Sequence, residues 1–253
     1  MVRLYVARHG QDGDNARGIL NGQRDQPLTE LGRQQARDVA QKMVDAGFTL
    51  AVTASSQSSS GLAKSMTSLS AIYSSPLQRA HETAKIFAEI LSNANDNDET
   101  PSSAPISTDT SNNKQCNTKV EILNGLIERD FGIMTGLPAS SILEKCGSDH
   151  VLVTEKINYF LDPTGAETFP DLIGRAKKLL SHIQQITSTY DADDAILLVT
   201  HGDFGKMLYA SYYDMDWEEV LKQFHFGNSE VLLLSKDSPP EKAHVFETIQ
   251  FNA

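Results

Sequence analysis

The sequence predicts an α/β fold, a three-layer α/β/α sandwich around a mostly parallel central sheet. Residues 195–199 form a continuous apolar run, which is typical of a strand buried on both faces of a parallel sheet. Shorter β-rich runs occupy residues 2–7 and 72–74, and each precedes a segment with apolar side chains at helical spacing. Strands therefore alternate with helices along the chain, as a layered α/β fold requires.

The elements can be placed in chain order. After the strand at residues 2–7, Thr29 marks the start of a helix expected over 29–46. The strand at 72–74 leads into a second helix, with Pro76 suited to its first turn. The rest of the chain predicts strands at 120–123, 195–199 and 231–234, a loop at 128–136 and a helix at 169–186.

The length and composition fit a single domain over residues 1–253, because 253 residues with 40% hydrophobic side chains can bury a sizeable core. Two polar stretches interrupt the pattern, at residues 51–70 and 93–118. Both are rich in small polar side chains and poor in large apolar ones, so we expect them to be mobile insertions.

The charge balance limits the partners that we expect. A formal net charge of −11 without a basic run argues against binding to nucleic acid or to a membrane surface. The chain starts with a strand pattern instead of a signal peptide, and no apolar run reaches membrane-spanning length. We therefore expect a cytoplasmic protein; the oligomeric state cannot be inferred from the sequence.

Two His-Gly pairs carry the chemical signal. His9-Gly10 and His201-Gly202 each follow a strand pattern, and ligands of open α/β sheets bind beyond the carboxyl ends of the strands. Arg8 and Arg79 stand at similar positions and could grip phosphate oxygens. A lone histidine at a strand end is more often structural, but two histidines with two arginines favour a phosphate site.

Other kinds of site fit the sequence less well. Zinc ligation by His9 and His201 has no His-rich or Asp-rich spacing to support it, and Arg8 would repel a cation. A dinucleotide-binding fold would need a Gly-x-Gly-x-x-Gly after the first strand, and that pattern is missing. We therefore expect no metal and no cofactor.

Four blocks surround these residues. They are Leu4 to Gly10 with Asn15, Asn21-Gly22 and Pro27 to Gly32; Ser74 to Ala80 with Thr83-Ala84; Glu128 to Gly132; and Val199 to Gly202. In this order they resemble the signature blocks of the histidine phosphatase superfamily, phosphoglycerate mutase-like branch. The resemblance spans residues 2 to 202 and implies a phosphoglycerate mutase-like fold that acts on a small phosphorylated substrate.

The resemblance also implies roles for individual residues. His9 would be the nucleophile, Glu128 the proton donor, and a protonated His201 with the two arginines would stabilise the transferring phosphoryl group. The implied catalytic set is His9, Glu128, His201, Arg8 and Arg79, and the implied phosphate- or substrate-binding set is Arg8, Gly10, Asn15, Asn21, Gly22, Arg79, Arg129 and Gly202. Because Glu128 must hold a proton near neutral pH, we expect burial or nearby acidic charge to raise its pKa.

Hydrolysis and mutase activity use the same machinery. A mutase of this family binds its substrate acid with a lysine and paired arginines after the Glu block, but residues 137–166 offer only Lys145, Lys156 and His150. This favours a phosphatase, although Glu128-Arg129 followed by an aromatic residue and Gly is more mutase-like. A cofactor-dependent phosphoglycerate mutase and a catalytically silent phosphate-binding module remain the alternatives.

Overall fold

The computed structural model of this protein describes residues 2–51, 67–94, 120–191 and 194–247. Its main sheet has the strand order β2-β3-β7-β1-β8, and β4 pairs with β3 alongside β2. Every pairing is parallel except that of β1 with β8. The strands are β1 (Arg3–Arg8), β2 (Phe48–Leu50), β3 (Thr67–Ser74), β4 (Val120–Ile122), β7 (Ala195–Thr200) and β8 (Val231–Leu234).

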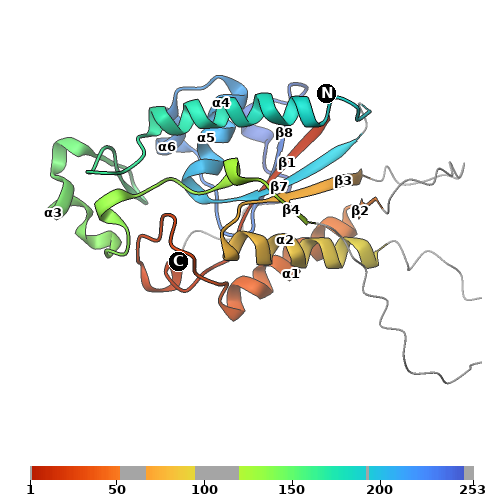
Figure 1. Cartoon of the computed structure of the whole chain (residues 1–253), viewed down its shortest axis with the longest axis horizontal. Helices are drawn as coiled ribbons and strands as arrows, with labels where there is room; N and C mark the ends of the chain where they lie inside the picture. Colours follow the sequence, from red (N-terminus) through yellow and green to blue (C-terminus); the bar gives the residue numbers. More distant parts are fainter. Residues whose placement is uncertain (1, 52–66, 95–119, 192–193, 248–253) are drawn as a thin grey trace, which may run out of the picture.

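Helices cover both faces of this sheet (Figure 1). On one face, α1 (Glu30–Asp45) and α2 (Gln78–Asn93) pack on side chains such as Tyr5 and Leu197. On the other face, α4 (Phe169–Ile186), α5 (Gly202–Tyr213) and α6 (Trp217–Gln223) pack on side chains such as Leu198. Successive strand residues thus enter opposite cores, as the two-residue period of a strand dictates, and the predicted three-layer fold is confirmed.

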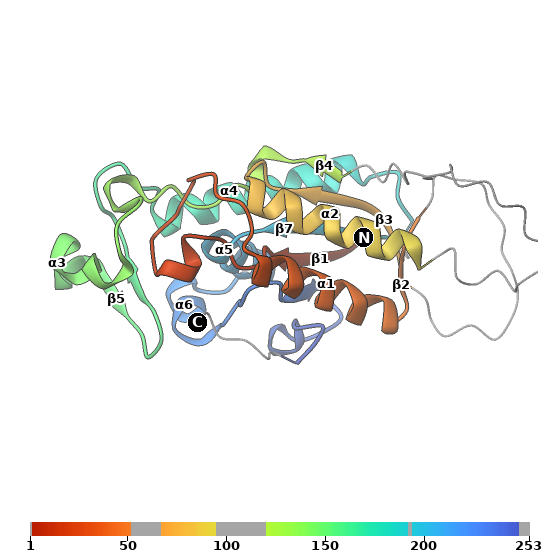
Figure 2. The same ribbon diagram turned by 90° about the horizontal axis from the view of Figure 1, so that it is seen from below.

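A smaller unit lies beyond the carboxyl ends of the parallel strands. It contains α3 (Ile142–Cys146) and the antiparallel pair β5 (Val151–Val153) and β6 (Asn158–Phe160), with its own apolar cluster that includes Phe131 and Phe160. Figure 2 shows α3 and β5 well to one side of the helices that cover the sheet. The unit therefore stands where a ligand at the strand ends would need a covering wall.

The long helices agree with the sequence pattern. Thr29 caps α1 by accepting a hydrogen bond from the Gly32 amide, and Thr168 closes a capping box at the start of α4. Pro76 lies before α2, not in its first turn, since that helix begins at Gln78. The loop expected at residues 128–136 contains one short 3-10 turn, Gly132–Met134.

One boundary was wrong. Residues 67–70, assigned above to a polar insertion, begin β3, and β2 was not anticipated. Leu69 is the one large apolar residue in that stretch and is fully buried, whereas Ser70 bonds the Asp194 carboxylate at 2.7 Å. The small polar residues around Leu69 conceal the strand. The remainder of the two predicted mobile insertions, apart from Ala51, Asn93 and Ala94, lies outside the described residues.

The described helices include none with the length and apolar character needed to span a membrane.

Candidate active site

The candidate site forms where β1, β7 and β3 end. His9 donates its backbone N–H to the Thr200 carbonyl at 3.0 Å, and Ser75 donates its own to the Val199 carbonyl at 2.9 Å. These bonds continue the parallel ladder one residue past each strand. As a result the two His-Gly pairs lie side by side, with the His9 and His201 ring centroids 5.0 Å apart.

His9 is held as a neutral imidazole with one nitrogen available. Its Nδ1 lies 2.6 Å from its neighbour's carbonyl oxygen at Gly10, a contact that only a protonated Nδ1 satisfies. Nε2 is then the acceptor, and Arg79 Nε donates to it at 3.1 Å. Burial, followed by the charges of Arg79 and Arg8, lowers the pKa of His9 well below its ordinary value. The unprotonated Nε2 that a nucleophile requires is therefore present at neutral pH.

Gly10 is required by close approach of the backbone. A Cβ at this position would lie 2.3 Å from the Gly32 carbonyl oxygen in the first turn of α1. Its N–H donates to the Thr83 hydroxyl at 3.2 Å, which connects the loop to α2. The loop after His9 is thus packed tightly between α1 and α2 by backbone contacts.

Arg79 is fully buried and reaches His9 from the start of α2. Its terminal nitrogens donate to the carbonyls of Arg24 and Gly22, at 2.7 and 2.8 Å, which fixes the plane of the guanidinium. Its Nε is also 3.3 Å from the carboxylate of Asp12. Three of its five N–H donors are used in these contacts, which leaves two for an oxyanion.

The carboxylate of Asp12 organises the loop beside His9, a contact that sequence reasoning missed. It accepts the backbone N–H groups of Asp14 and Asn15, each at 2.8 Å, and the side-chain amide of Asn21. Burial raises its pKa, partly offset by these hydrogen bonds and by Arg79. Asn21 is therefore fixed by an intraprotein bond, whereas the side-chain oxygen of Asn15 is buried with no hydrogen-bond partner in the described structure.

Arg8 packs against the start of α5. It donates to the Phe226 carbonyl at 2.7 Å, and a Cβ on Gly202 would lie 3.3 Å from its Cζ atom. Any side chain at position 202 would press on the guanidinium. Burial lowers the pKa of Arg8, although it stays a cation.

His201 differs in one respect from the expectation. Its Nε2 lies 2.7 Å from the Ser75 hydroxyl, and its Nδ1 is buried with no hydrogen-bond partner in the described structure. Burial and the charges of Arg79, His9 and Arg8 lower its pKa well below the ordinary value. Burial, followed by the charges of the two arginines, thus favours a neutral His201 in the ligand-free site, and the protonated His201 expected above stays a prediction for the site with phosphate bound.

Glu128 fulfils the expectation of a raised pKa. It is 5% exposed, and burial followed by the charge of Asp203 raises its pKa. Its oxygens accept the backbone N–H groups of Arg129, Phe204 and Asp203 at 2.8 to 3.2 Å, which offsets part of the shift. Arg175, a residue not identified from the sequence, donates to the backbone carbonyl of Glu128 at 3.3 Å and to those of Gly125 and Ile127.

A cleft of about 140 Å³ lies between the carboxyl end of the sheet and the unit that contains β6, and some of these groups line it, whereas the buried His9, Arg79 and His201 are not part of its lining. It is lined by Arg8, Asn15, Asn21, Glu128, Arg129 and Gly202 together with Ile19, Leu20, Phe131, residues 157–160, Asp203 and Lys206. Arg129 is 1% exposed, bonds Asp203 at 2.9 Å and the Phe160 carbonyl at 3.0 Å, and lies over three phenylalanine rings. It therefore serves first as part of the cleft wall.

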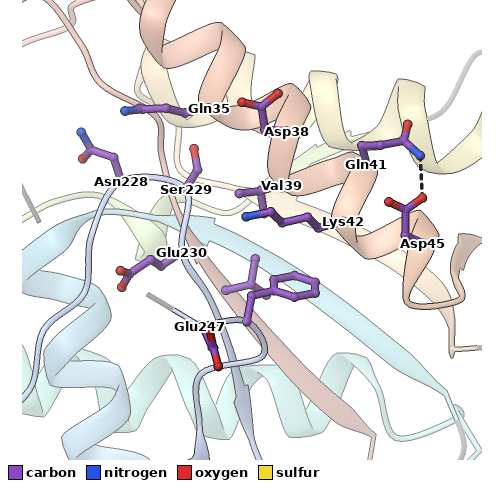
Figure 3. A pocket seen from close by; sticks show the side chains of 12 residues that line it. Gln35, Asp38, Val39, Gln41, Lys42, Asp45, Asn228, Ser229, Glu230 and Glu247 are labelled. Carbon is purple, nitrogen blue, oxygen red and sulfur yellow. Dashed lines mark hydrogen bonds between the residues drawn. The ribbon is translucent and has the colours of Figure 1, made fainter. Parts of the chain in front are cut away.

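A larger cavity, of about 480 Å³, lies between α1 and the segment before β8 (Figure 3). Its charged lining is Asp38, Asp45, Glu230, Glu247 and Lys42. The excess of carboxylates opposes an anionic ligand there, and none of the sequence-predicted site residues lines this cavity. The described residues hold no cluster of three or more His, Cys, Asp or Glu side chains suited to a metal ion.

Fold and site together define a class of layered α/β proteins in which two buried histidines lie side by side, with arginines, where the strands of a parallel sheet end. Residues 4–60 and 106–242 match the family model of the histidine phosphatase superfamily (branch 1). The chain belongs to this superfamily, as its sequence blocks indicated.

Two phosphoglycerate mutases are similar to this chain in sequence. A 2,3-bisphosphoglycerate-dependent phosphoglycerate mutase of Nitrobacter hamburgensis is 24% identical over 220 residues, which cover 87% of this chain and 85% of the relative. A similar mutase of Brucella anthropi is 24% identical over 96% of this chain and 98% of its own.

The solved structures show the same fold. A mycobacterial glucosyl-3-phosphoglycerate phosphatase in complex with VO3 has a TM-score of 0.64 at 22% identity, over 93% of each chain. Phosphoserine phosphatase of Entamoeba histolytica, with 3-phosphoglyceric acid, has a TM-score of 0.59 at 20% identity, over 98% of this chain and 96% of that one.

Proposed function

We propose that this protein is a metal-independent phosphomonoester hydrolase that acts on a small phosphorylated metabolite through a phosphohistidine at His9. The observation that carries the proposal is the state of His9, a buried neutral imidazole whose Nδ1 is held by the Gly10 carbonyl. Among the described residues, its Nε2 lone pair accepts a hydrogen bond from the Arg79 N–H alone. Nε2 can attack a phosphoryl group once this N–H turns to an oxygen of that group.

The reaction has two steps. In the first, His9 Nε2 forms a bond to phosphorus, the bond from phosphorus to the leaving oxygen breaks, and the Glu128 carboxyl gives its proton to that oxygen. In the second, Glu128 takes a proton from water as the water oxygen bonds to phosphorus and the P–N bond breaks. The raised pKa of Glu128 suits the first step, and the carboxylate that it leaves suits the second.

Charge stabilisation comes from the protein's own cations. Arg8 and Arg79 are both buried beside His9, where their attraction to the equatorial oxygens is screened little by water. A bound phosphate dianion favours protonation of His201, because nearby negative charge raises a histidine pKa. Its unpartnered Nδ1 would then become a further donor.

A phosphoglycerate mutase is the second candidate, since the relatives in the sequence comparison carry that name. Residues 137–166 contain no arginine, however, so the cationic segment with which mutases of this family hold an acid during transfer is not matched in the sequence. The structural neighbours named above are phosphatases. We therefore place hydrolysis first.

Steady-state hydrolysis of p-nitrophenyl phosphate and of 3-phosphoglycerate, with a chelator present, tests the proposal. We expect phosphate release that resists the chelator and is abolished by His9→Ala. Formation of 2-phosphoglycerate instead of phosphate would favour the mutase. Activity that survived His9→Ala would overturn the mechanism, and an inactive intact protein that still bound phosphate would favour a silent binding module.

A further inference from the structure

The inner wall of the cleft holds a lysine to which the mechanism assigns no role. Lys206 lies in the second turn of α5, is 3% exposed and lines the same cleft as Arg8 and Glu128. Its ammonium donates to the Tyr159 hydroxyl at 2.6 Å and lies 4.9 Å from the centre of that ring. The phenol of Tyr159, from β6, is thus its one polar partner among the described residues.

Among the described residues, no carboxylate pairs with this ammonium. The nearby carboxylate of Asp203 is 2.9 Å from Arg129, and Glu128 is held by backbone N–H groups. No described carboxylate lies within 4.0 Å of Lys206 Nζ. A buried ammonium is costly unless an anion pairs with it, so a phenol alone leaves the site electrostatically incomplete.

The helix places Lys206 on the same side of the cleft as Arg8. Gly202 packs on the Arg8 guanidinium, and Lys206 follows four residues later on the same face of α5. Four residues advance an α-helix by about 6 Å. Arg8 and Lys206 thus line the same cleft from positions about one helical turn of backbone apart. A small ligand whose two anionic groups are joined by a short carbon chain or a single sugar ring would meet both cations in this cleft.

We propose that Lys206, oriented by the Tyr159 phenol, binds a second anionic group of the substrate, a carboxylate or a second phosphate, while its phosphomonoester reacts at His9. The assignment rests on the proposed function for the identity of the reacting group. It places the substrate-binding cation in α5, outside residues 137–166, where the sequence offered no arginine.

Matched substrate pairs test the assignment. 3-Phosphoglycerate and glycerol 3-phosphate differ by a carboxylate in place of a hydroxymethyl group, and fructose 1,6-bisphosphate and fructose 6-phosphate differ by one phosphate. In Lys206→Met we expect kcat/KM for the doubly anionic member of one pair to fall about 10- to 100-fold, the loss of one charge-assisted hydrogen bond. Its partner should change less than about threefold.

Several controls separate this role from a structural one. Lys177→Met removes the same charge from α4, where Lys177 lies outside the cleft lining, and should change neither pair. Lys206→Arg should keep the discrimination. Tyr159→Phe, which preserves the ring, should weaken the doubly anionic member alone, and it provides a second test if Lys206→Met folds poorly.

Binding measured by calorimetry in the His9→Ala background makes the test independent of turnover. Discrimination in binding there, together with an intact protein that releases no phosphate from any of the four esters, would refute the hydrolase proposal and still support Lys206 as an anion site. Equal losses for both members of each pair, or no loss, would overturn the assignment. The pair that responds identifies carboxylate or phosphate as the second group.

Discussion

Substitution of Glu128 by Gln removes the proton that the leaving oxygen needs while it preserves the shape of the side chain. The amide oxygen can still accept the N–H groups of Arg129 and Phe204, which bond one carboxylate oxygen now. The amide nitrogen would face the N–H of Asp203, at present 3.2 Å from the other oxygen. We therefore expect a folded protein with one weak hydrogen bond lost and no general acid.

The size of the effect depends on the leaving group. General acid catalysis contributes about 10²- to 10⁴-fold, so kcat/KM for an alkyl phosphate should fall by that factor, about 3 to 5 kcal/mol in barrier. p-Nitrophenolate leaves without a proton, so kcat/KM for its ester should change less than about tenfold. In the intact enzyme, kcat/KM for the alkyl ester should fall as the pH rises through the raised pKa of Glu128, because the carboxyl then loses its proton.

Pre-steady-state kinetics provide the second readout. Without the base of the second step, the phosphoenzyme should accumulate, and p-nitrophenyl phosphate should give a burst of about one equivalent of nitrophenol followed by slow turnover. Glu144→Gln, an exposed position paired with Lys145, is the matched control. Equal losses for both esters, without a burst, would refute the assignment of Glu128 as acid and base.

Three further outcomes follow from the geometry. Gly10→Ala should lower the free energy of unfolding, measured in urea, by about 1 to 3 kcal/mol, because the new Cβ meets a backbone oxygen at 2.3 Å. Gly174→Ala, in open space within α4, should raise it by about 0.5 to 1 kcal/mol. A change of the same sign for both variants would contradict the packing. Ser75→Ala removes the hydroxyl 2.7 Å from His201 and should lower kcat by about 2- to 10-fold, and an unchanged rate would remove that contact from the mechanism. Burial and two arginines lower the pKa of His9, so His9 should stay neutral at pH 6.5 and its protonation should not reduce the activity there. A loss of activity centred at pH 6.5, assigned to His9 by a titration of the histidine in the absence of phosphate, would disprove its buried neutral state.

The local sequence was sufficient to predict those strands and helices in which the pattern of apolar residues matches the pattern of burial. β7 is apolar at every position but its last and fully buried, and α4 has both a periodic apolar face and a capping box. Strand ends beside glycine also located the histidines, because the fold class alone brings the ends of parallel strands to one edge. Where neighbouring strands supply the burial, as for Leu69 in β3, the pattern of a single segment is insufficient.

The groups missed in the site share a different property, which is that their roles depend on contacts far along the chain. Asp12 looks like an exposed loop residue until Arg79, 67 positions later, is placed beside it. The sequence gives no sign that Lys206 in α5 is buried, and in the structure its ammonium lies against Tyr159 of β6. The blocks locate the residues that we propose to contact the phosphoryl group, because the ends of parallel strands bring them together. Asp12 and Lys206 could not be assigned in this way, because their partners come from segments far along the chain, so for this protein the walls of the cleft say more about the substrate than the blocks do.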